Sequence, residues 1–137
     1  MRAVVVRSYG SYDDARVEDI DVPQPGKGEV LLEIHAAPVN YVDLLVISGK
    51  YQFLPKLPFT PGKGPVGVIK AVGADVSGLK IGDRVLAMAE QGGYAQYALA
   101  PAKSCYVLPD GLSYVQAGAM SLAFDTSWFA LRERARI

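Results

Sequence analysis

Short apolar segments rich in Val and Ile are separated along this chain by glycine and proline, a pattern typical of strands joined by turns. Within residues 30–37, apolar positions alternate with Glu33 and His35, as expected for a strand with one buried and one half-polar face. The predicted strands are residues 3–8, 16–22, 30–37, 66–72, 83–89, 94–100 and 104–108. Their spacing favours a barrel, so we expect a mainly β domain.

Two segments have helical rather than strand periodicity. Residues 40–48 carry apolar side chains at i, i+3 and i+4 and predict a short helix that interrupts the barrel. After Gly118, apolar residues recur at three- and four-residue steps and predict a C-terminal helix. The apolar stripe of this helix is Met120, Phe124, Trp128 and Leu131. The helix stops at Ile137 without a capping residue, so we expect the chain to continue in a longer parent protein.

Composition narrows the function classes. The 137 residues include 14 Lys plus Arg and 14 Asp plus Glu, which gives a formal net charge of zero, and 50% are hydrophobic. This describes one globular domain without the clustered basic residues that bind nucleic acids or anionic membranes. We also expect no signal peptide and no membrane span. Cys105 is the single cysteine and cannot form an internal disulfide, which fits a reducing compartment, and we predict a cytoplasmic protein.

One glycine-rich motif has the spacing of a nucleotide-binding turn but the wrong context. Residues 62–67, GKGPVG, match the G-x-G-x-x-G pattern by which backbone amides approach a pyrophosphate at a helix N-terminus. That turn follows a buried strand and opens a helix, whereas here a proline-rich loop precedes it and the β-like residues 66–72 follow. We therefore interpret it as a turn that leads into a strand.

Four polar side chains are candidates for a site at the rim of the barrel. Asn40 and Asp43 would jointly orient a polar ligand, although their spacing equally suits a helix N-cap with an acid in the first turn. Tyr51 offers a phenol to a carbonyl oxygen. Lys63 offers an ammonium that would polarise a substrate oxygen or, alternatively, is a solvated surface lysine. Spacing alone therefore predicts a β-barrel domain with a polar site at its rim.

Three blocks of sequence resemble a known superfamily. The blocks are VNYVDLLVISGKY, LPFTPGKGPVGVIKAVGADVSGLKIGDRV and GGYAQYALAP, and they resemble the medium-chain dehydrogenase/reductases, in particular the zinc-free, ζ-crystallin-like quinone oxidoreductases. The resemblance covers the N-terminal GroES-like domain and implies a partly open β-barrel with a short helix near residues 40–48 and a C-terminal helix. It divides the chain into a catalytic domain, residues 1–118, and the start of a linking helix, residues 119–137. That helix would lead to a Rossmann domain that these residues do not contain.

The resemblance implies that no zinc is bound. The zinc-containing branch of the superfamily has a ligand cysteine where this chain has Asn40, and a ligand histidine followed by glutamate where it has Lys63 and Gly64. His35 and Cys105 are too few to replace the usual three or four protein ligands.

The resemblance also implies hydride transfer from NADPH to a quinone or an activated enone. By position, Asn40 and Asp43 match the family's Asn-x-x-Asp at the nicotinamide end of the cleft, and Tyr51 matches an aromatic residue of the substrate pocket. The acceptor carbonyl would be polarised by hydrogen-bond donors, namely Asn40 with Tyr51 or Lys63. Asn40 and Thr126 would contact the cofactor.

Three positions depart from the family pattern and leave the acceptor open. Gly64 replaces a commonly acidic residue, Gln96 stands where glutamate is usual, and Leu45 occupies a place often held by tyrosine. We expect the chain to be inactive without its nucleotide-binding domain and the full-length parent to be a homodimer. The alternative hypothesis is a stand-alone GroES-like barrel that serves protein interaction or assembly through its apolar helix. An alcohol dehydrogenase with an unorthodox metal site ranks last.

Overall fold

The computed structural model describes residues 1–137 and is mainly β, as the sequence pattern predicts. Five antiparallel strands form one sheet in the order β6-β3-β4-β5-β7. These strands are β3 Glu29–Ala36, β4 Val66–Val72, β5 Arg84–Ala87, β6 Tyr97–Pro101 and β7 Cys105–Val107. A second, two-stranded sheet pairs β1 Arg2–Val5 with β2 Arg16–Asp19. A strand rather than a helix follows the glycine-rich turn, which confirms the interpretation of that motif.

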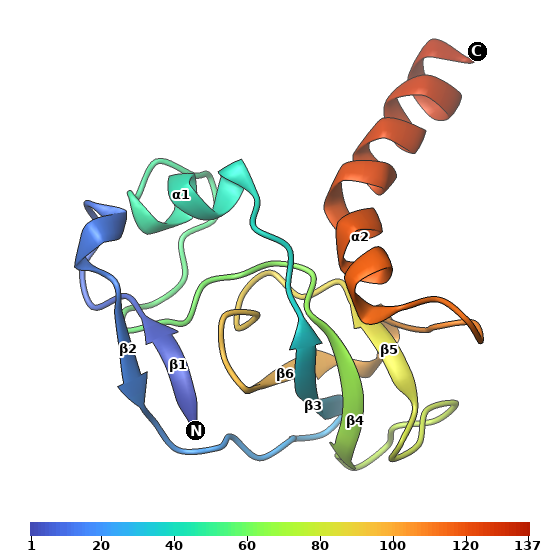
Figure 1. Ribbon diagram of the computed structural model, residues 1–137, viewed down its shortest axis with the longest axis horizontal. Coiled ribbons are helices and arrows are strands. Elements are labelled where there is room, and N and C mark those ends of the chain that lie inside the picture. The colour runs from blue at the N-terminus through green and yellow to red at the C-terminus, as the bar shows by residue number, and fades with distance from the viewer.

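Two isolated bridges join the sheets into a partly open barrel. Ala3 pairs with Ala95, and Val6 pairs with Phe59. Figure 1 shows the sheet of β1 and β2 beside the larger sheet, with long loops connecting the two sheets. The predicted fold class, a mainly β domain with a short helix and a C-terminal helix, is therefore confirmed. Single 3-10 turns occur at Tyr12–Asp14 and Ala102–Ser104.

The core consists of two apolar clusters. The larger cluster lies on the inner face of the five-stranded sheet and contains Val30, Leu32, Ile69, Val85, Ala87, Ala89 and Ala100. The smaller cluster packs Val46 and Ile47 of helix α1, Tyr41–Ile47, against Val6 and Phe59. The predicted helix at residues 40–48 is thus confirmed, and its apolar residues attach it to the β1 side of the barrel.

The terminal helix α2 spans Tyr114–Trp128 and begins five residues before the predicted start at residue 119. Its N-cap is Ser113, whose hydroxyl accepts from the Gln116 backbone N–H at 3.2 Å, while the Gln116 side-chain oxygen accepts from the Ser113 N–H at 3.1 Å. This reciprocal capping box is a strong start signal. The prediction missed it because Gly118 looked like a break; in the structure Gly118 lies buried inside the helix.

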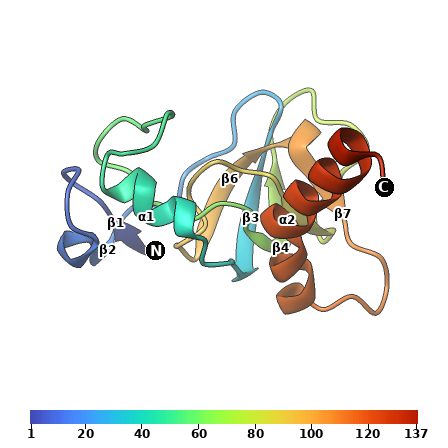
Figure 2. The same ribbon diagram turned by 90° about the horizontal axis from the view of Figure 1, so that it is seen from above.

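Aromatic stacking attaches the start of α2 to the sheet, where the helix packs on β3, β4 and β5 (Figure 2). The His35 ring of β3 stacks on Tyr114 with 4.5 Å between ring centroids, and the Arg84 guanidinium of β5 lies 4.7 Å from the same ring centroid. His35 therefore has a packing role.

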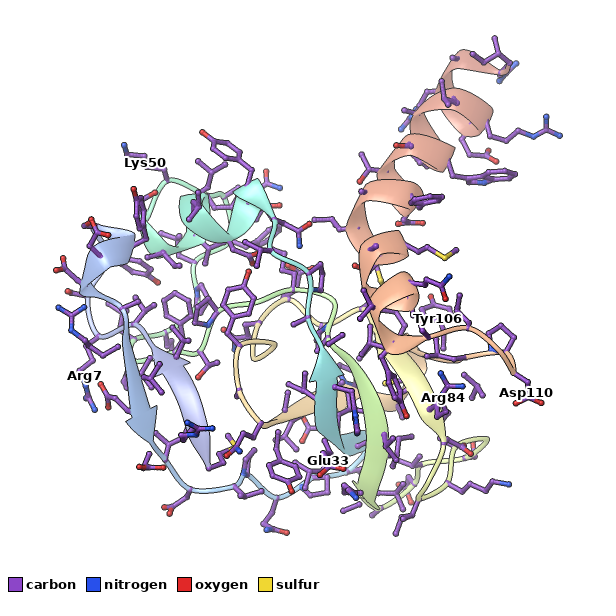
Figure 3. All side chains as sticks on the ribbon, viewed as in Figure 1. Arg7, Glu33, Lys50, Arg84, Tyr106 and Asp110 are labelled. Carbon is purple, nitrogen blue, oxygen red and sulfur yellow. The ribbon has the colours of Figure 1, made fainter.

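The outer part of the helix projects away from the barrel. Helical turns of π type continue it over Phe129–Ala135, and its side chains stand clear of the strands in Figure 3. Phe124 is 62% exposed, Trp128 65% and Leu131 52%. The predicted apolar stripe is present, and no other part of the described chain covers it. No helix has the length and apolar character needed to cross a membrane.

We predict opposite effects of two glycine-to-alanine substitutions. A Cβ at Gly67 would lie 1.9 Å from the Glu33 carbonyl oxygen, so Gly67→Ala must separate β3 from β4 and should lower the free energy of unfolding by about 2 kcal/mol or more. A Cβ at Gly118 would meet Val66 at an ordinary 3.6 Å, so Gly118→Ala should raise stability by about 0.5–1 kcal/mol. Urea denaturation measures both values; equal effects of the two substitutions would contradict the prediction.

Candidate functional site

The carboxylate of Asp43 is buried at the first turn of α1 and accepts two hydrogen bonds. The residue is 2% exposed. Its Oδ2 atom accepts from the Asn40 backbone N–H at 2.9 Å and from the Tyr94 hydroxyl at 2.8 Å. The first bond belongs to the helix cap that the Asn-x-x-Asp spacing predicts. Asp43 therefore positions its neighbours rather than facing an open cavity.

Tyr94 comes from the connection between β5 and β6, and sequence reasoning did not select it. Its hydroxyl also lies 3.3 Å from the Pro38 carbonyl oxygen. Burial, and next the adjacent Asp43 carboxylate, raise the pKa of Tyr94 well above its usual range. The phenol thus stays protonated and remains a donor to Asp43. The Gly-Gly-Tyr block contains this residue, but only the fold reveals its partner, 51 residues away.

The side-chain amide of Asn40 is the buried polar group that lacks a partner. Its Nδ2 atom is buried and makes no hydrogen bond within the structure. An unpaired buried donor costs about 1–3 kcal/mol, so the amide would be stabilised by any acceptor that reached it. A carbonyl oxygen of a bound molecule fits this donor chemically.

Lys63 and Tyr51 meet in a small pocket. The Lys63 Nζ atom lies 5.2 Å from the centroid of the Tyr51 ring and forms an ion pair with Glu90. Lys63 is only 7% exposed, so the interpretation as a solvated surface lysine is wrong. The pocket has a volume of about 110 Å³ and is lined by Val42, Tyr51, Lys63, Gly64, Met88, Ala89, Glu90, Ser121 and Leu122.

Gly64 lets helix α2 approach this pocket. A Cβ at Gly64 would lie 2.8 Å from the Ser121 hydroxyl oxygen, and the φ of +65° also favours glycine. Ser121 is buried and donates to the Gly118 carbonyl oxygen at 2.9 Å. The departure from an acidic residue at position 64 is thus explained by close packing against the helix.

The candidate residues fall into two neighbouring groups. Asn40 and Asp43 form one, and Tyr51 and Lys63 form the other; Val42 of α1 lines the pocket beside them. Thr126 is exposed on the projecting part of α2 and does not line this pocket, so its cofactor contact stays a prediction.

The structure brings together no cluster of metal-ligating side chains, and the absence of zinc stays a prediction. No group of three or more His, Cys, Asp and Glu side chains is placed to share a metal ion. At the two positions matched to zinc ligands, the chain presents an amide and an ammonium. Cys105, whose thiol pKa burial raises to about 11, lies instead at the start of β7.

The fold and this site define the class of protein. A family model for the alcohol dehydrogenase GroES-like domain matches residues 26–110, and the chain belongs to that family. More narrowly, it corresponds to the N-terminal part of medium-chain dehydrogenase/reductases of the quinone oxidoreductase branch, which confirms the resemblance seen in the sequence.

Human quinone oxidoreductase is 42% identical to the chain over 133 residues, which cover 96% of this chain and 40% of that protein. The crystal structure of human synaptic vesicle membrane protein VAT-1 homolog-like protein superposes with a TM-score of 0.94 at 34% identity, covering 100% of this chain and 44% of that one. Escherichia coli quinone oxidoreductase complexed with NADPH gives a TM-score of 0.88 at 25% identity, covering 98% and 41%. The chain spans about two fifths of the length of these curated relatives.

We predict that Tyr94→Phe lowers the free energy of unfolding by about 1–3 kcal/mol, because the buried Asp43 carboxylate loses a donor. Tyr97→Phe is the matched control, since no hydrogen bond of its hydroxyl is present. Folding raises the pKa of Tyr94, so its contribution is complete below about pH 10, where unfolded tyrosine ionises, and is lost as the pH rises further. Urea unfolding from pH 7 to 11 should therefore show the wild-type advantage shrinking in alkali; a gap that widens there would contradict this origin.

Proposed function

We propose that this chain is the acceptor-binding catalytic domain of an NADPH-dependent quinone or enone oxidoreductase that transfers hydride to an activated carbonyl or alkene without zinc. The observation that carries the proposal is the buried, unpaired amide of Asn40, at the N-terminus of the helix whose Val42 lines a pocket that holds a buried ammonium. Such donors polarise an oxygen without a metal. Several proteins similar to this chain are quinone oxidoreductases, which supports reduction of a quinone as the reaction.

Each polar residue has a distinct role in this proposal. The Asn40 amide donates to the acceptor oxygen, on which negative charge grows during the reaction. The Lys63 ammonium, held against Tyr51, adds a positive charge to the pocket that takes part of the acceptor. Asp43 touches no acceptor; it fixes the backbone of Asn40. The apolar lining from Val42, Met88 and Leu122 excludes water, which strengthens both donors.

NADPH, when bound, supplies the hydride. Its nicotinamide end would lie against Asn40 and Thr126, as the resemblance implies. The glycine-rich turn of residues 62–67 leads into β4 and so offers no helix N-terminus to a phosphate. We propose that the pyrophosphate is held by a nucleotide-binding domain outside these residues, and that the chain does not turn over without it.

A second function is favoured by the exposed helix. The apolar residues of the projecting part of α2, including Phe124, Trp128 and Leu131, would serve a stand-alone domain as a surface for protein interaction or assembly. Sedimentation separates the hypotheses: a defined oligomer that buries this helix and does not respond to an added nucleotide-binding domain would favour the second one.

We expect NADPH to bind weakly to the 137-residue chain alone. Dinucleotide-binding domains hold the pyrophosphate at a glycine-rich turn that opens a helix, and no such turn is present in these residues. Fluorescence titration should show a dissociation constant far above the micromolar range, and addition of the nucleotide-binding domain of a related quinone oxidoreductase should tighten it. Micromolar affinity for the isolated chain would contradict the proposal.

We expect Asn40→Ser to lower quinone turnover by about 100-fold in the enzyme assembled with a nucleotide-binding domain, because it removes the amide donor while keeping a residue that caps α1. Gln24→Ala removes an exposed amide and is the matched control. Steady-state kinetics should show the loss in kcat rather than in KM, since the donor acts on the charge of the transition state. Unchanged kcat in the serine variant would remove Asn40 from the mechanism.

A further inference from the structure

The ion pair between Lys63 and Glu90 is unequal in exposure. The Lys63 side chain is 9% exposed, whereas that of Glu90 is 79% exposed. Lys63 belongs to the turn before β4, and Glu90 reaches its ammonium from the connection between β5 and β6. The cation is therefore buried in the pocket, while most of its anionic partner stands in solvent.

Lys63 has no second anionic partner in the pocket. The other lining residues contain no carboxylate. The Ser121 hydroxyl donates to the Gly118 carbonyl oxygen, and Tyr51 presents its ring to the ammonium. A buried ammonium without a counter-charge is strongly unfavourable. Any group that displaces Glu90 must therefore bring its own negative charge.

The size of the pocket limits what enters it. Its volume is about 110 Å³. Pockets that enclose a whole drug-sized ligand have roughly 300–1,000 Å³. This one therefore takes an end group of a larger molecule, and a planar carboxylate is small enough to reach the ammonium through it.

We propose that the pocket at Lys63 binds a carboxylate carried by the electron acceptor, and that Glu90 occupies this position until the acceptor displaces it. The inference rests on the proposed function and adds the substrate class, an anionic quinone or enone. The exposed Glu90 carboxylate is weakly held, because solvent screens it and its side chain loses freedom on pairing. A carboxylate on a rigid ring loses less freedom and meets the ammonium in the dry part of the pocket.

The test compares an acid with its ester in the 137-residue chain. The probes are 1,4-naphthoquinone-2-carboxylate and its methyl ester, which differ mainly in charge, and the readout is the ratio of their affinities by NMR titration. The wild-type chain should prefer the acid. Glu90→Gln removes the internal competitor from an exposed position and should raise the acid-to-ester ratio about tenfold.

The controls separate this pocket from the overall charge of the chain. Asp75→Asn breaks an exposed ion pair with Lys27 and changes the net charge equally, so its ratio should match the wild type. Lys63→Met should bring the ratio close to one, and Lys63→Arg should retain a preference for the acid. An equal response to Glu90→Gln and Asp75→Asn, or displacement of the acid by equimolar inorganic phosphate, would overturn the inference.

Failure of this inference is distinguishable from failure of the proposed function. If the assembled enzyme reduces acid and ester at equal kcat/KM, and Glu90→Gln leaves that ratio unchanged, the acceptor is not selected by charge, yet the oxidoreductase function stands. If neither quinone is reduced, the proposed function fails as well.

Discussion

The buried carboxylate of Asp43 is the contact on which the geometry of the site depends. It holds the backbone of Asn40 at the start of α1 and receives the Tyr94 hydroxyl from a segment 51 residues further along the chain. Tyr94 in turn lies against Gly62, where a Cβ would come within 2.5 Å of its ring. One acidic side chain thus joins the helix that carries Asn40 to the turn that carries Lys63.

Backbone hydrogen bonds extend this junction. The segment before β6 runs beside the glycine-rich turn and is joined to it by three backbone hydrogen bonds. The N–H groups of Gly92, Gly93 and Tyr94 donate to the carbonyl oxygens of Thr60, Gly62 and Pro61, at 2.8, 2.9 and 2.9 Å. Two loops that are distant in sequence therefore behave as one unit. Lys63 lies on one of these loops and Glu90 on the other. The backbone hydrogen bonds already hold the two loops together, so the ion pair does not have to supply the conformational entropy cost of ordering them.

The sequence predicts local features of this protein well and long-range ones poorly. The strands, α1 and the Asn-x-x-Asp cap follow from periodicity and capping rules that act within a few residues. The burial of Lys63 depends on Glu90, 27 residues away, and on Ser121 in α2, so composition alone favoured the wrong, solvated state. Tyr94 and Glu90 were missed for the same reason.

The contact between Gly64 and Ser121 makes helix α2 part of the site. The same helix then continues away from the barrel. The turn and the helix lie so close that a single added methyl group would collide with the Ser121 side chain. At its N-terminal end, α2 is fixed to the sheet by Tyr114, while its outer part is free of the barrel. Ser121 lies between this anchor and the outer part, so a displacement of α2 at Ser121 would change the space around the turn that holds Lys63, because packed interiors transmit small displacements.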